Sequence, residues 1–505
     1  MPLTRKPLVS WRPWGLAALF LVLVTGAVVL AVSRPLCCAD DAAHAVLAKN
    51  LAFGYGYANT LGHNTYTFAF RRFDPVIGTG PTIIVPAALG IWLFGNEASV
   101  PGLSAIVLWA GLCVLLYRAV ARTTSTDRAV PTAACFLVVC FVVSPYSAFQ
   151  WFALLGEVPA TLLVLLCAVT LATDKPSAGK AWLAGLFLGF AVAAKLLTVI
   201  YAFPALAFVA LRPAGSRRAR MVGVGAFIAG LMLPTCAFET WKFASLRGAY
   251  LDALSNMLQF VRATGLAQEE QPLAVRVAVR LHDYRERFGV PLPLVALTAA
   301  LSGWIVMRRG EHLARRIVLL LSGFAVLHLG YWLVASNGNP RYAFPATMLL
   351  AALISARYLA KPSRVAGLAF ALALAGVIAP PLDRVPFYGS FYTSDVMGSS
   401  DSAAEETADF LLAHRGRGIV LTQWWGTAAA LEYASAQAWI FDGYNVYASR
   451  VPGSGALIAY SVDFLDTTDK QFGDLVAACG PPVFSSGPYR VHQCAGPSGV
   501  AATKG

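Results

Sequence analysis

The chain has 505 residues, of which 57% are hydrophobic and only 13% are charged, and its mean hydropathy is +0.62. Soluble domains carry about 25% charged residues, so this composition excludes an ordinary soluble protein and indicates one that crosses a membrane several times. The formal net charge is +13, but the basic residues gather at the ends of apolar segments, which indicates membrane topology and no nucleic-acid partner.

Eleven apolar segments are candidate membrane spans, because a helix needs about 20 apolar residues to cross the hydrocarbon core. We expect the first one to remain as an anchor, since no small-residue cleavage site follows it. The predicted spans cover residues 13–32, 98–120, 130–149, 156–172, 181–196, 197–211, 221–238, 289–307, 317–335, 342–359 and 365–381.

The placement of one further apolar run, Thr79–Gly95, depends on charge, since cytoplasmic turns are rich in Lys and Arg. Two basic regions flank the first two spans, with Arg5, Lys6 and Arg12 before residue 13 and Arg118, Arg122 and Arg128 around residue 120. If both are cytoplasmic, the chain leaves through 13–32 and returns through 98–120. Thr79–Gly95 is short and contains two prolines, so it is predicted to lie along the outer face as an interfacial or re-entrant helix.

The same rule orients the whole chain, with the N-terminus in the cytoplasm. We expect a multi-pass protein of a bacterial plasma membrane, and the absence of an Asn-x-Ser/Thr sequon agrees with this. The parts expected outside are the loop 33–97, a turn at 145–157, a long loop at 239–288, and the C-terminus.

The C-terminal residues 383–505 are more polar and differ in pattern from the transmembrane module 1–382. Helix and strand patterns alternate there, which predicts a small α/β domain outside the membrane. Cys479 and Cys494 can pair if this domain lies in an oxidising compartment. The predicted helices are Ala403–Ala413 and Thr427–Ala434, and the predicted strands are Gly418–Thr422 and Ala438–Phe441.

Acidic side chains gather at the predicted outer face, where a carboxylate is costly unless it is paired or used. Asp40 and Asp41 begin the loop 33–97, Asp74 follows later in it, and Glu157 opens a span. A carboxylate there can remove the proton of an acceptor hydroxyl. The alternative is that Asp40, Asp41 and Glu157 only cap helix N-termini.

Cationic side chains are predicted at the same face. Lys195 ends an apolar run and Arg341 precedes a span, so both can bind a lipid phosphate, with weaker contributions from Arg71 and Arg72. The alternatives are a lysine that snorkels to the interface and an arginine that anchors at headgroup level.

A divalent cation is a further option. Asp40 and Asp74, joined by His44, offer oxygen and imidazole ligands, although no spacing here is diagnostic of a metal site. The chain contains no GxxxxGK[ST] phosphate loop, no HExxH and no GxSxG motif.

These motifs, in this order, resemble the GT-C class of membrane glycosyltransferases, in the branch that holds protein O-mannosyltransferases and lipid A aminoarabinose transferases. The similar stretches are Asp40 to Gly56, Phe73-Asp74-Pro75 with the apolar run after it, Gly156-Glu157-Val158-Pro159, Lys195, and Pro340-Arg341-Tyr342.

The resemblance implies a polytopic helical fold, a polyprenyl-phosphate sugar as donor, and transfer at the non-cytoplasmic face with inversion. It makes Asp40 the acid-base position with Asp41 beside it, and it places Lys195, Arg341 and Tyr342 near the lipid phosphate. His44, next to these acids in the sequence, is a further candidate for substrate or phosphate binding. The aminoarabinose transferases carry an Arg soon after the acidic pair, where this chain has Ala43.

The sequence therefore predicts a hexosyl- or pentosyltransferase that acts on a glycan, lipid or protein acceptor of the cell envelope. Two alternatives remain open. One is a polysaccharide polymerase or ligase that uses a diphosphate-linked glycan. The other is a transporter without chemistry, which is less favoured because the charges lie at the outer ends of spans and no internal repeat is visible.

Overall fold

The computed structural model describes residues 13–33, 36, 39–59, 71–73, 80–142, 151, 153–173, 177–211, 216–265, 271–360, 401–414, 420–422, 426–435, 443–444, 457–462, 476–477 and 479–494. The predicted span 365–381, the predicted strand Ala438–Phe441 and the candidate ligand Asp74 lie outside these residues.

Helices occupy ten of the eleven predicted spans. Six of them are long and apolar enough to cross a membrane, and several others are shorter than 18 residues, so the total of eleven spans stays a prediction. The helices are α1 (Pro13–Ser33), α4 (Ser99–Thr123), α5 (Thr126–Val142), α7 (Glu157–Ala172), α8 (Ala178–Ala194), η1 (Leu196–Tyr201) with α9 (Ala202–Ala210), α10 (Arg217–Leu246), α13 (Leu292–Arg309), α14 (His312–Gly330) with η3 (Tyr331–Ala335), and η4 (Pro340–Ala343) with α15 (Phe344–Ala360).

Helix α7 is the centre of this bundle. Apart from Thr170, all of its residues are buried, as expected of a helix that is apolar on every side. It packs against α4, α8, α14 and α15. Because α7 begins with Glu157, the bundle places that carboxylate in its interior.

Small residues let α8 and α10 approach closely. A Cβ on Gly185 would lie 2.1 Å from the Phe227 carbonyl oxygen, and one on Gly230 would lie 2.1 Å from that of Trp182. Contacts of this kind are typical of membrane helices, which associate through close packing. The pair holds the C-terminal end of α8, and with it Lys195, against the bundle.

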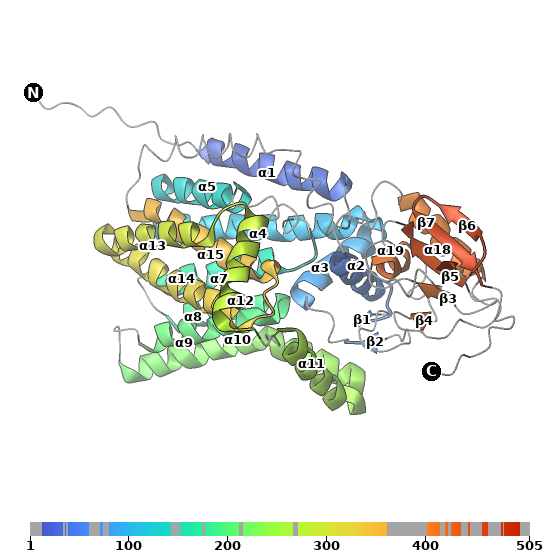
Figure 1. Ribbon diagram of the computed structural model, residues 1–505. Coiled ribbons are helices and arrows are strands. Elements are labelled where there is room, and N and C mark those ends of the chain that lie inside the picture. Colours follow the sequence, from blue (N-terminus) through green and yellow to red (C-terminus); the bar gives the residue numbers. More distant parts are fainter. Residues whose placement is uncertain are drawn as a thin grey trace, which may run out of the picture.

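Two shorter helices, α2 (Ala39–Ala52) and α3 (Pro81–Phe94), lie between the bundle and the C-terminal sheet, as Figure 1 shows. At about 1.5 Å per residue, the 14 residues of α3 reach about 21 Å, which is too short for a hydrocarbon core of about 30 Å. Helix α3 buries Ile84 and Ala87 against α2, and the Gly80 amide donates to the Ala194 carbonyl at 3.0 Å. These features agree with the prediction that Thr79–Gly95 does not cross the membrane.

The loop predicted at 239–288 is largely helical, which the sequence analysis did not expect. Helix α10 continues to Leu246, and α11 (Tyr250–Gly265) and α12 (Leu273–Phe288) follow. Both later helices are strongly amphipathic in sequence, with charged residues on one side. Helix α12 contacts η3 and η4, so it lies beside the segment that carries Arg341.

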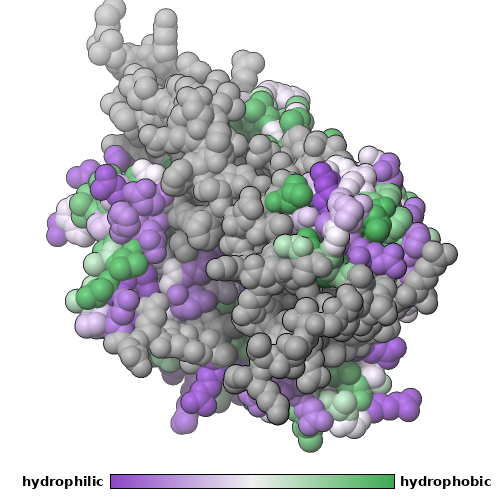
Figure 2. Space-filling model, turned by 45° about the vertical axis from the view of Figure 1, so that its right-hand side comes forward, coloured by the Kyte–Doolittle hydropathy of each residue, from purple (hydrophilic) through white to green (hydrophobic). Residues whose placement is uncertain are grey.

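The C-terminal part is an α/β unit, as predicted. Its five-stranded sheet has the order β4-β3-β5-β7-β6, in which β3 is parallel to β4 and β5, and β7 is antiparallel to β5 and β6. In the view of Figure 2, many of the described residues at the surface are hydrophilic. Its elements are α18 (Asp401–His414), β3 (Val420–Thr422), α19 (Gly426–Ala434), β4 (Gly443–Tyr444), β5 (Leu457–Ser461), β6 (Pro482–Ser486) and β7 (Tyr489–Gln493), preceded by the short strands β1 (Ala58–Asn59) and β2 (Arg71–Arg72) of the outer loop.

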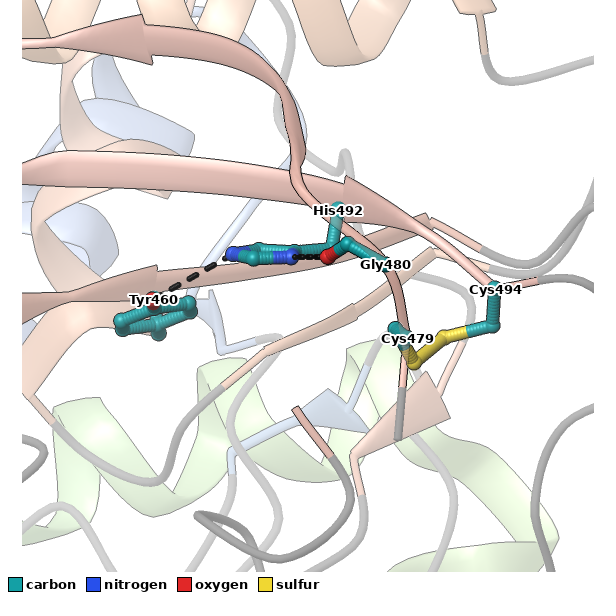
Figure 3. Close-up of a disulfide and its surroundings, with 5 residues drawn as sticks. All are labelled: Tyr460, Cys479, Gly480, His492 and Cys494. Carbon is teal, nitrogen blue, oxygen red and sulfur yellow. Dashed lines mark hydrogen bonds between the residues drawn. A yellow bond between two sulfur atoms is a disulfide. The ribbon is translucent and has the colours of Figure 1, made fainter. Parts of the chain in front are cut away.

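Cys479 and Cys494 form a disulfide, which confirms that these two cysteines can pair (Figure 3). Beside it, His492 Nδ1 donates to the Gly480 carbonyl at 2.7 Å, and the Tyr460 hydroxyl lies 3.3 Å from Nε2 of the same ring. The disulfide ties the end of β7 to the segment before β6. Disulfides of this kind persist in oxidising compartments.

Helix α19 joins the C-terminal unit to α2. The Lys49 ammonium, fully buried, donates to the carbonyls of Glu432 and of Ser435, the latter at 2.9 Å. A cation there suits the negative end of α19. The Tyr433 hydroxyl donates to the Glu97 carbonyl at 2.9 Å. The C-terminal unit therefore contacts α2 and the segment between α3 and α4.

Candidate active site

Asp40 and Asp41 lie in the first turn of α2, where carboxylates interact well with the helix dipole. Their contacts differ. The Asp40 carboxylate forms an ion pair with the Arg341 guanidinium, across a sequence separation of 301 residues. Asp41 is buried, and its Oδ1 accepts a hydrogen bond of 2.7 Å from the Leu154 amide. Asp40 thus faces the cationic residues, while this bond of Asp41 holds α2 against the turn that precedes Glu157.

Glu157 lies between two cations. One of its carboxylate oxygens, Oε1, is 3.2 Å from Lys195 Nζ and 3.1 Å from Arg341 Nε. Its side chain is 2% exposed, so both interactions lie in a medium of low dielectric constant. Lys195 is itself buried and paired, which argues against the alternative that it only snorkels to the interface.

The ends of two helices place Lys195. Helix α8 stops at Ala194, because Lys195 has an extended backbone, and η1 begins at the next residue. The Lys195 carbonyl accepts from both the amide and the hydroxyl of Thr198, at 3.0 and 2.9 Å. The break in the helix points the lysine into the bundle end where Glu157 begins α7.

Burial and the neighbouring positive charges shift the pKa of Asp40 in opposite directions. Burial alone would raise its pKa, but the positive charges of Arg341 and Lys195 outweigh burial and hold the pKa at about 2. Burial and the charge of Lys195 lower the pKa of His44 to about 3, so the imidazole is neutral at neutral pH. His44 Nδ1 has no hydrogen-bond partner among the described residues.

The segment 336–342 places Arg341. The Asn339 side chain accepts from the Arg341 amide at 3.0 Å, and the Trp332 indole donates to the Asn339 carbonyl at 3.1 Å. His328 Nε2 lies 2.7 Å from the Tyr342 carbonyl, and the Arg341 guanidinium carbon lies 5.6 Å from the centre of the Tyr342 ring.

The sequence analysis missed a second arginine beside this segment. Arg280 of α12 is buried and donates to three carbonyls around η3. The sequence offers only a weak signal for it, because Arg280 is one of several charged residues in a segment predicted to be a loop.

The structure therefore brings together five of the predicted site residues: Asp40, His44, Glu157, Lys195 and Arg341, with Tyr342 against the last of them. Arg71 and Arg72 form β2, which pairs with β1, and the Arg72 side chain is exposed.

The metal option has little support among the described residues. They contain no group of three or more His, Cys, Asp and Glu side chains that could hold an ion. Asp40 is paired with Arg341, and the other proposed ligand, Asp74, lies outside the described residues.

The fold is similar to that of solved structures of one other protein. No family model matches the sequence, and no curated protein matches it. The structure is similar to that of ArnT from Cupriavidus metallidurans in the apo state, with a TM-score of 0.61, 12% identity, and coverage of 95% of this chain and 98% of that one. For the same protein bound to undecaprenyl phosphate, the TM-score is 0.57 and the identity 13%, with the same coverage. The chain therefore has the GT-C fold that the resemblance implied.

Proposed function

We propose that this membrane protein is a glycosyltransferase that moves a sugar from a polyprenyl monophosphate to a hydroxyl acceptor at the outer face of a plasma membrane. The observation that carries the proposal is the buried group in which Lys195 and Arg341 share Glu157, with Asp40 on the other side of the arginine. Two fixed cations next to an acid suit a phosphate leaving group and a base. The binding of undecaprenyl phosphate by ArnT, a protein of the same fold, supports this donor class.

The reaction would be a single displacement with inversion. The acceptor oxygen forms a bond to the anomeric carbon as the bond between that carbon and the phosphate oxygen breaks, and the electron pair leaves with the polyprenyl phosphate. The phosphate charge becomes more negative by one, which Lys195 and Arg341 would stabilise. Asp40 would accept the hydroxyl proton.

This role requires Asp40 to leave Arg341. A carboxylate with a pKa of about 2 is a weak base, and the ion pair is what lowers it. An incoming phosphate offers Arg341 a doubly hydrogen-bonded partner in place of Asp40, since guanidinium matches phosphate geometry. Donor binding would then free the carboxylate and raise its pKa at the moment the base is needed.

The test is turnover by the purified protein in lipid nanodiscs, with a panel of synthetic polyprenyl-monophosphate sugars and release of polyprenyl phosphate as the readout. Asp40→Asn should lower turnover by about 100-fold or more while undecaprenyl phosphate still binds. The matched control is Asp252→Asn, at an exposed position of α11, which should turn over normally.

Full turnover by Asp40→Asn would refute the assignment of the base. Turnover with diphosphate-linked glycans alone would instead favour a polymerase or ligase. Movement of intact lipid without bond cleavage would favour a transporter.

A further inference from the structure

Arg280 is the least expected buried charge in the described structure. It lies on α12, its exposed fraction is 2%, and its guanidinium donates to backbone carbonyls. A buried guanidinium is costly unless its donors are satisfied. What satisfies them here is the backbone of the segment that leads to Arg341.

Its hydrogen bonds are short and converge on one turn. Arg280 Nη1 donates to the carbonyls of Trp332 and Leu333 at 2.9 and 2.7 Å, and Nη2 donates to that of Ser336 at 2.6 Å. These carbonyls belong to η3, a π-helical turn, and to the residue after it. π-helical turns leave carbonyls that ordinary α-helical bonding would use, and they are frequent at functional sites.

The absence of a side chain at Gly338 allows the backbone to approach the Arg280 guanidinium closely. The φ of Gly338 is +81°, in the left-handed region that favours glycine. A Cβ at this position would lie 2.9 Å from Arg280 Nε. The loop therefore closes directly over the guanidinium, three residues before Arg341.

We propose that Arg280 is a positioning residue, which fixes the 336–341 segment so that the Arg341 guanidinium reaches the donor phosphate. The inference rests on the proposed function, because it assigns Arg341 to the phosphate. Its hydrogen bonds to the carbonyls of Trp332, Leu333 and Ser336 mean that it acts on Arg341 through the backbone of this segment. Three bonds from one rigid, planar cation fix the direction of a chain turn better than a flexible ammonium can.

The first test measures the dissociation constant of undecaprenyl phosphate for the full chain in nanodiscs. Arg280→Met should raise it about tenfold, as expected for the loss of one well-placed charged contact at the phosphate. Arg280→Lys should recover part of the loss, and Gly338→Ala should weaken binding in the same direction. The matched control is Arg285→Met, an exposed arginine of the same helix, which should bind as the wild type does.

A double variant separates positioning from general damage. If Arg280 acts only through Arg341, then Arg280→Met with Arg341→Met should bind no more weakly than Arg341→Met alone. Fully additive losses would overturn the inference, as would wild-type binding by Arg280→Met.

If the wild type itself fails to bind undecaprenyl phosphate, the proposed function falls, and a second measurement decides the inference. An experimental structure of the Arg280→Met protein should then show the Asp40–Arg341 pair opened and the 336–341 segment displaced. An unchanged pair in that structure would overturn the positioning role.

Discussion

Glu157 Oε1 lies 3.2 Å from Lys195 Nζ, and both side chains are buried at the start of α7 and the end of α8. The carboxylate also touches Arg341, so Glu157 is an ion-pair partner of both cations, and Asp40 is a second partner of Arg341. In the proposed site these acids compensate the cations while no phosphate is bound, since unpaired charges in the interior destabilise the fold by several kcal/mol.

Replacing Glu157 by Gln should therefore destabilise the protein by about 3–5 kcal/mol, since two buried cations lose a shared partner. Undecaprenyl phosphate should restore much of this loss, because its phosphate supplies the missing charge. The measurement is the thermal midpoint with and without this lipid. The ligand-induced rise should be larger in Glu157→Gln than in the wild type, whereas equal rises would contradict the compensation argument.

The exposed Glu286 of α12 provides the control. Glu286→Gln removes the same charge without a buried partner, so its midpoint and its response to the lipid should match the wild type.

The Asp40–Arg341 pair predicts a defined pH dependence. The folded-state pKa of Asp40, about 2, is below its ordinary value of 3.8, so the unfolded chain binds the proton more tightly. The stabilisation is complete above the unfolded value and is lost as the pH falls toward 2. The stability difference between wild type and Asp40→Asn should shrink between about pH 5 and about pH 3. Thermal unfolding in detergent across this range is the measurement, and a constant difference would contradict the lowered pKa.

Charge and hydropathy patterns predicted most of the fold because the membrane imposes both. Apolar runs located ten helices. Basic turns separated Thr79–Gly95 from the spans, and this stays a prediction, because α3 is one of several apolar helices shorter than 18 residues. The helices within residues 239–288 were not predicted, because they are amphipathic and charged, and a search for membrane spans looks only for apolar runs. Arg280 lies in one of these helices, so its role at the site was not predicted either.

The sequence predicted which residues belong to the candidate site but not which of them form ion pairs and hydrogen bonds with one another. Topology predicted Asp40, Glu157, Lys195 and Arg341 at one face, and in the structure ion pairs join these four side chains. The family resemblance favoured Asp40 over Asp41 as the acid-base position, but no sequence pattern predicted that Asp41 accepts a hydrogen bond from the Leu154 amide. Pairings of this kind depend on contacts between distant segments, which no local pattern encodes.

Lys49 should hold the C-terminal unit against α2. Lys49→Met removes the donor to the carbonyls of Glu432 in α19 and of Ser435 after it, and removes the positive charge that interacts with the buried Glu432 carboxylate. We expect a loss of about 3 kcal/mol and faster hydrogen exchange in α19 and α2. Adding Glu432→Gln to Lys49→Met should recover part of the stability. Exchange rates that stay at wild-type values in α19 would contradict this role. The control is Asp409→Asn, at an exposed position of α18.

The glycines of α8 and α10 should set the stability of the bundle. Gly185→Ala places a Cβ 2.1 Å from the Phe227 carbonyl oxygen, which forces α8 and α10 apart. A shift of this kind costs about 1–3 kcal/mol, like other overpacked sites. Gly225→Ala on α10 is the matched control, because its Cβ would meet no atom within 4 Å. Alanine favours a helix over glycine by up to about 1 kcal/mol, so this control should unfold at the wild-type temperature or above it. Thermal unfolding of the two variants side by side measures the difference, and equal midpoints would show that the close contact does not limit stability.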